Sequence, residues 1–69
     1  MKSKYVIRIY DLQGQFTSIS FEAAQYQART AFFALVSALT ISDYSEVQLC
    51  VTAPSMFVVV DKVRIPWRG

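Results

Sequence analysis

The chain has 69 residues, a formal net charge of +2, no histidine and one cysteine. A chain of this length supports one hydrophobic core, so we expect residues 1–69 to form a single domain, with residues 66–69 as a tail. Because 54% of the residues are apolar and 17% are charged, the chain can fold without a metal ion or a disulfide. The composition excludes a disulfide scaffold and a zinc site built from histidine and cysteine.

The sequence lacks the features of secreted and membrane-spanning proteins. The apolar run that follows the basic N-terminal residues is interrupted by Arg8 and Asp11, so a secretory signal peptide is not expected. The longest weakly polar stretch, residues 31–39, is much shorter than the roughly 20 apolar residues of a membrane span. We therefore expect a cytoplasmic protein that does not associate with a membrane.

The first part of the chain predicts a β-hairpin. Side chains alternate over residues 4–10, which are rich in β-forming types, as in a half-buried strand. Asp11 and Gly14 then supply a tight turn, because aspartate can cap such a turn and glycine tolerates a positive φ. Residues 15–19 again favour a strand, which completes the hairpin.

A helix is predicted next, over residues 21–39. Ser20 is a good N-cap, Glu22 would place a negative charge in the first turn, and the following alanines and leucines favour a helix. After a connection over residues 40–45, a second hairpin is predicted from strands at residues 46–52 and 56–63, with a turn at Pro54. Lys62 and Arg64, with Pro66, would end its regularity.

These elements give an α+β fold of order ββαββ, with one helix packed on one face of a four-stranded, mainly antiparallel sheet. Counting strands along the chain, the helix returns the chain so that strand 3 runs parallel to strand 2 and can pair antiparallel with strand 1, which favours the order 2-1-3-4. The order 2-1-4-3, with a parallel central pair, stays open. In both cases the other face of the sheet is left to solvent or to a partner.

The predicted helix has one apolar face and one unusual back. On a helical wheel, the face expected to form the core contains Phe21, Ala24, Ala28, Ala31, Phe32, Leu35 and Leu39. The back contains Tyr26, Thr30, Phe33 and Ser37, flanked by Arg29 and Val36. Two aromatic residues on a helix back indicate an interaction patch; alternatively, they are isolated exposed rings or pack under the loop at residues 40–45.

The open face of the sheet is a second candidate surface. If Ile7, Leu49 and Val58 point to the helix, the residues that point away are Val6, Arg8, Tyr10, Gln48, Cys50, Phe57 and Val59. An ordinary half-solvated face, with cross-strand pairs such as Arg8 and Glu46 and with Trp67 packed over it, is the preferred interpretation.

The basic residues suggest an alternative function. Six of the seven lie in the terminal segments, and a basic rim of Lys4, Arg8, Lys62 and Arg64, with Trp67 as a stacking ring, resembles what single-strand binding uses. A net charge of +2 is small for a nucleic-acid binder, and no recognised nucleic-acid-binding motif is present. Nucleic acid is therefore the less favoured partner.

No catalytic or cofactor site is expected. The chain lacks histidine, its five acidic residues are scattered, and acid-base catalysis usually needs one or the other in a pocket. Cys50 lies in a β-forming run without a base nearby in sequence, as a packed residue would. Only two glycines are present, neither in a strand-to-helix turn, which excludes a glycine-rich phosphate cradle.

The sequence thus predicts a non-enzymatic interaction module without cofactors. In the leading hypothesis, a helix patch of Tyr26, Arg29, Thr30 and Phe33 binds another protein, a protein complex or a second copy of the chain. No family motif is present, but at the level of topology this element order resembles small inhibitors encoded by phages and mobile elements, anti-CRISPR proteins among them. That resemblance implies an inhibitor that occludes a surface of a partner complex.

Overall fold

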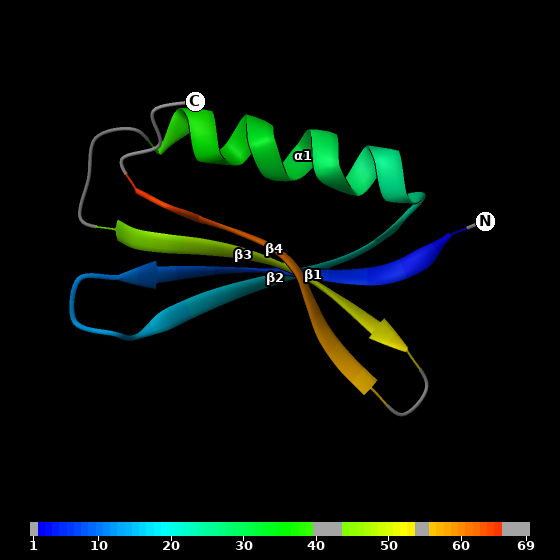
Figure 1. Cartoon of the computed structure of the whole chain (residues 1–69), viewed down its shortest axis with the longest axis horizontal. Helices are drawn as coiled ribbons and strands as arrows, with labels where there is room; N and C mark the ends of the chain where they lie inside the picture. The colour runs from blue at the N-terminus through cyan, green and yellow to red at the C-terminus, as the bar shows by residue number, and fades with distance from the viewer. Residues whose placement is uncertain (1, 40–43, 54–55, 66–69) are drawn as a thin grey trace.

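The computed structural model describes residues 2–39, 44–53 and 56–65. It confirms the α+β fold of order ββαββ. Figure 1 shows one helix lying across one face of a twisted sheet. The elements are β1 (Ser3–Asp11), β2 (Phe16–Ala23), α1 (Gln25–Ala38), β3 (Tyr44–Ala53) and β4 (Met56–Arg64).

The strand order is β2-β1-β3-β4, and every neighbouring pair is antiparallel. This confirms the favoured order and shows that 2-1-4-3 is wrong. β1 and β3 form the centre of the sheet, so β2 and β4 are its edges. Trp67 and the rest of the predicted tail lie outside the described residues, as do most of the predicted connection at residues 40–45 and Pro54.

The turn between β1 and β2 has the predicted chemistry. The Asp11 carboxylate Oδ1 accepts hydrogen bonds from the backbone N–H groups of Gln13 (2.9 Å) and Gln15 (3.0 Å). Gly14 has a φ of 86°, a conformation that disfavours residues with a Cβ atom. Aspartate and glycine therefore fix this hairpin and its register.

The start of the helix differs from the prediction. Ser20 and Glu22 belong to β2, and the helix begins four residues later than expected, at Gln25. β2 extends because it pairs with β1 up to Ala23, which lies opposite Ser3. The strand pairing overrides the local helical preference of these residues. Gln27 then accepts the N–H of the N-cap residue Ala24 at 3.1 Å, so the helix starts without a serine cap.

The hydrophobic core lies between α1 and the two central strands. Ala28, Phe32 and Val36 are its fully buried helix residues, at the i, i+4 spacing of one face. From the sheet come Tyr5, Ile7, Ala23, Val47 and Leu49. The 14-residue helix is about 21 Å long at ~1.5 Å per residue, shorter than the sequence predicted.

The buried face of α1 is rotated relative to the predicted one. Ala31, expected in the core, is exposed, and Val36, expected beside the helix back, is fully buried. Phe21 lies in β2 and packs against the core from the sheet. Burying valine removes more apolar area from water than burying alanine. This difference favours the orientation of α1 that buries Val36 in place of Ala31.

Among the described residues, no helix combines the length and the apolar character needed to cross a membrane.

Candidate interaction surface

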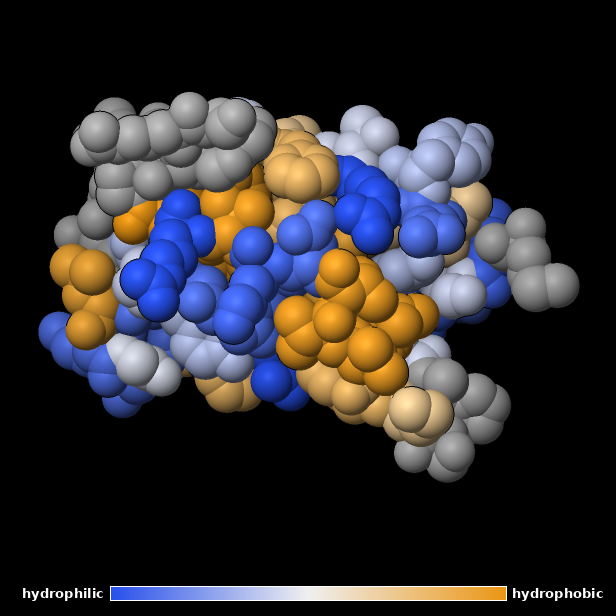
Figure 2. All heavy atoms as spheres, viewed as in Figure 1, coloured by the Kyte–Doolittle hydropathy of each residue, from blue (hydrophilic) through white to orange (hydrophobic). Residues whose placement is uncertain are grey.

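An apolar run on the edge strand β4 is the most unusual surface of the molecule. Five consecutive residues are exposed: Met56 (61%), Phe57 (44%), Val58 (39%), Val59 (45%) and Val60 (38%). Within the described chain β4 pairs only with β3, so the outer edge of this apolar run (residues 56–60) faces outward. Figure 2 shows a continuous apolar area over this part of the strand. Such a patch commonly marks an interaction site.

A β-bulge divides β4 into two parts. Leu49 lies opposite Asp61, but its neighbour Cys50 lies opposite Val59, so Val60 is an extra residue. A bulge bends its strand and increases the local twist. In Figure 1 the end of β3 and the start of β4 turn away from α1, whereas the later half of β4 runs close to the helix. The bulge therefore separates the apolar run from the helix-covered sheet.

The later half of β4 is attached to the rest of the fold. Arg29 on α1 forms an ion pair of 3.0 Å with Asp61. Val63 and the following Ile65 pack against the core, and Ile65 donates its backbone N–H to the Ser45 carbonyl at 3.0 Å. The residues of the apolar run are exposed, and none of them belongs to the core. Within the described chain the run is held by its pairing with β3, whereas the later half of β4 is also attached to the helix and the core.

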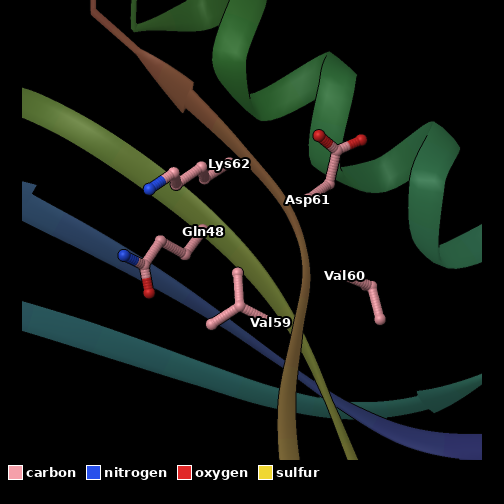
Figure 3. Close-up of a pocket in the computed structure, with 5 residues that line it drawn as sticks. All are labelled: Gln48, Val59, Val60, Asp61 and Lys62. Atoms are coloured by element: carbon pink, nitrogen blue, oxygen red, sulfur yellow. The ribbon is translucent and has the colours of Figure 1, made fainter.

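The surface is hollowed beside the bulge. Gln48, Val59, Val60, Asp61 and Lys62 line an open depression of about 420 Å³. In Figure 3, Asp61 points toward α1, while Gln48, Val59 and Lys62 lie on the other side of β4. Its one carboxylate, Asp61, is engaged by Arg29, and Lys62 supplies an amine at the same depression. The rest of the lining is apolar or amide and suits a partner side chain.

The open face of the sheet carries the predicted residues. The strand register places Arg8, Gln48 and Lys62 side by side across it, with Cys50 and Val59 as the next pair. The Arg8 guanidinium carbon lies 4.9 Å from the Phe16 ring centre and 4.4 Å from that of Phe57. Arg8 therefore makes cation–π contacts with two rings, and the predicted Arg8–Glu46 pair is wrong: Gln48, not Glu46, lies opposite Arg8.

The described members of the basic rim share this open face. Lys4, Lys62 and Arg64 are exposed, and Arg8 is half-buried between its two aromatic neighbours. Acidic residues interrupt the rim, because Glu22 lies opposite Lys4 and Glu46 lies opposite Arg64. The predicted stacking residue, Trp67, is outside the described residues. The structure places the four cations on one face, with Arg8 against Phe16 and Phe57, and does not separate them from negative charge.

The predicted helix patch is only partly exposed. Tyr26 is 71% exposed, and exposed Thr30 donates its hydroxyl to the Tyr26 carbonyl at 2.9 Å. Arg29 pairs with Asp61. Phe33, expected on the helix back, is half-buried, packs against the core and meets Phe32 edge-on at 5.1 Å between ring centres. The rotation that buries Val36 also turns Phe33 toward the sheet.

The single cysteine has the environment of a packed residue. Cys50 is fully buried and lies opposite Val6 and Val59. Burial raises the pKa of its thiol above the ordinary value, an effect that nearby Arg8 partly offsets. A protonated thiol is a poor nucleophile. No group of three metal-ligating side chains occurs among the residues that the structure describes.

Sequence reasoning placed residues 56–63 in a strand but did not single out the exposure of their first five. It assigned Val58 to the helix side and Phe57 and Val59 to the open side, as the register confirms. The sequence analysis did not predict that the helix, with 14 residues, leaves the first half of β4 uncovered. An uninterrupted apolar pentapeptide in the last strand is the signal that could have revealed it.

Comparison of the chain with protein-family models, with curated proteins and with solved structures finds no match.

Proposed function

We propose that the protein is a non-enzymatic interaction module that binds another protein through the apolar run of β4. The observation that carries this proposal is the exposure of five consecutive apolar residues on an edge strand. Natural sheet edges are usually protected by charges, prolines, bulges or a covering element. Here the bulge at Val60 and the charged residues Asp61, Lys62 and Arg64 come only at the end of the run, which leaves residues 56–59 open to a partner.

The edge offers two kinds of binding energy. Its outward backbone groups can hydrogen-bond to an added strand, while alternate side chains reach pockets on either side of that strand. Phe57 and Val59 lie on the open face, and Met56 and Val58 lie on the opposite face of the hairpin. A partner strand would therefore cover apolar side chains on both faces.

The proposed mode of action is occlusion. A module that binds tightly to a surface can inhibit a complex without chemistry of its own. The proposal extends to a cytoplasmic inhibitor of the kind that phages and mobile elements encode, anti-CRISPR proteins included. Support for that context is the ββαββ element order alone.

Nucleic-acid binding is the second candidate, favoured by one feature of the open face. Arg8 lies between Phe16 and Phe57, and exposed Lys4, Lys62 and Arg64 share that face. Aromatic rings combined with cations bind single strands by stacking and phosphate contacts. The interspersed Glu22 and Glu46 weaken this candidate, because they reduce the attraction for phosphate.

A nuclease-treated affinity capture from source cells, read by mass spectrometry, tests the proposal with four folded variants. Val58→Lys places a charge in the apolar run. Ile19→Lys is the matched control, since Ile19 is a similarly exposed apolar residue on the other edge strand, β2. Tyr26→Ala alters the helix patch, and the double variant Lys62→Ala/Arg64→Ala alters the basic rim.

The expected result is a defined protein that wild type, Ile19→Lys and Tyr26→Ala capture and that Val58→Lys does not. Loss of capture with Tyr26→Ala alone would assign binding to the helix patch and overturn the β4 proposal. Nucleic acid that co-purifies without nuclease, and that the double variant loses, would favour the second candidate instead. Circular dichroism of each variant establishes that it is folded.

A further inference from the structure

We propose that the apolar run of β4 pairs antiparallel with the same run of a second copy, about a two-fold axis at Val58. Two four-stranded sheets would then form one continuous sheet. This inference rests on the proposed function, because it names one partner of the same surface. The contact would be isologous, with the same residues on both sides, as in most symmetric dimers.

The shape of the molecule allows the approach. β4 is the last strand of the sheet, and its first half projects beyond the part of the sheet that α1 covers (Figure 1). The helix is attached at Asp61 and beyond, through the Arg29 ion pair and the packing of Val63. A second strand can thus lie along residues 56–60 without displacing the helix.

The sequence of β4 selects the register. With Val58 on the axis, Met56 of each copy lies opposite Val60 of the other, and Phe57 lies opposite Val59. Phe57, Val58 and Val59 then have apolar neighbours across the interface, and Met56 meets Val60, the extra residue of the bulge. Cross-strand apolar pairs stabilise a sheet. The run is therefore complementary to itself.

Other antiparallel registers are less favourable. Moving the axis to Val59 brings Asp61 opposite Phe57, and moving it to Val60 brings Lys62 opposite Val58. Each shift buries a charge against an apolar side chain, which costs free energy unless the charge finds a partner. Asp61 also already pairs with Arg29. The charged residues that follow the run thus disfavour an axis beyond Val58, whereas an axis at Phe57 would place Val59 and Val60 opposite residues 55 and 54, outside the run.

The alternation of side chains makes both faces of the junction apolar. Phe57 and Val59 lie on the open face, and Met56 and Val58 on the other. The junction is short, so we expect a weak, concentration-dependent dimer of the kind that small interfaces form. A net charge of +2 per copy adds only a small repulsion, which salt would screen.

Sedimentation velocity of the full chain from about 5 μM to about 1 mM, the range in which so small an interface would saturate, tests the association. We expect wild type and Ile19→Lys to shift from monomer to dimer, whereas Val58→Lys stays monomeric. A wild-type chain that is monomeric throughout this range overturns the inference. A dimer that survives Val58→Lys also overturns it, because association would then use another surface.

Cysteine cross-linking tests the register without relying on a lysine variant. In a Cys50→Ser background, Val58→Cys should form a disulfide dimer under mild oxidation, since directly opposite residues have the separation that a disulfide needs. Met56→Cys and Val60→Cys should cross-link to each other when mixed, and neither should cross-link to itself. Ile19→Cys is the matched control and should remain monomeric. Any other pattern of cross-links excludes an axis at Val58.

The two proposals can fail separately. A monomeric wild type that still captures a different protein, and loses it with Val58→Lys, would retain the proposed function and remove the dimer. A Val58-dependent dimer whose capture of another protein is unaffected by Val58→Lys would retain the dimer and remove the proposed partner surface.

Discussion

The Nη1 atom of Arg29 on α1 lies 3.0 Å from Oδ2 of Asp61 on β4, and this ion pair joins the helix to the edge strand directly after the bulge. Before Asp61 the strand is apolar and exposed; after it, Val63 packs against the core. The pair therefore marks the point at which β4 passes from the projecting hairpin to the packed sheet. Its side chains are 42% and 27% exposed, so solvent weakens the attraction.

A double-mutant cycle of Arg29→Met and Asp61→Asn should give a small coupling energy. We expect about 0.2–1 kcal/mol in the free energy of unfolding, as for other exposed pairs, with a decrease at high salt. Urea denaturation of the four proteins measures it. Hydrogen exchange at the amides of Val60 and Lys62 should become faster in both single variants. A zero coupling with unchanged exchange would show that the pair does not hold β4.

Three aromatic residues of α1 should differ in stability when truncated. Phe32 is fully buried, so Phe32→Ala should cost about 3–5 kcal/mol, which approaches the total stability of a small domain. Phe33 is half-buried against the core, and its truncation should have an intermediate cost. Tyr26→Ala should change the free energy of unfolding by less than about 0.5 kcal/mol, since the side chain is 71% exposed. Thermal and urea unfolding establish the ranking.

Equal, small effects of Phe33→Ala and Tyr26→Ala would contradict the packing of Phe33. Both rings would then be available on the helix back, and the helix patch would compete with β4 as the binding surface. Loss of partner capture by Phe33→Ala is informative only if that variant retains its fold by circular dichroism.

Local sequence patterns were sufficient to predict the sheet. Alternation over residues 4–10 and 46–52, with the Asp11 and Gly14 turn, indicated the strands and hairpin that the structure contains. The order β2-β1-β3-β4 followed from the strand directions, because a helix that returns the chain leaves β3 antiparallel to β1. The start of the helix did not follow, because Ser20 favours a cap locally while pairing with β1 continues to Ala23. Long-range pairing decided that boundary.

The candidate surface depended on information that single residues do not carry. Phe57 and Val59 were assigned to the correct face by alternation. Their exposure, however, depends on where the 14-residue helix ends and on the extra residue Val60 at the bulge. The alternation of side chains along a strand indicates neither the end of the helix nor the position of the bulge. Phe33 was misplaced because the predicted apolar face included Phe21 and Ala24, which precede the helix, and Ala31, which is exposed.

Alanine substitutions should show that Asp11 contributes to stability as a capping residue and that Ser20 does not. Ser20 is an exposed strand residue opposite Val6, so Ser20→Ala should change stability by less than about 0.5 kcal/mol. Asp11→Ala removes the acceptor of two backbone N–H groups and should cost about 1 kcal/mol or more. Urea midpoints compare them. A cost near 1 kcal/mol for Ser20→Ala would instead restore this residue as the helix N-cap.

The buried thiol of Cys50 should make stability fall at alkaline pH. Burial raises its pKa in the folded protein, so the folded state keeps a proton that the unfolded chain releases at the ordinary pKa. The contribution is full below that ordinary value, about 8.5, and is lost as the pH rises above it toward the folded pKa. Relative to Cys50→Ser, the free energy of unfolding of wild type should therefore decrease over this range. Parallel pH profiles for the two proteins would show that the thiol titrates normally despite its burial.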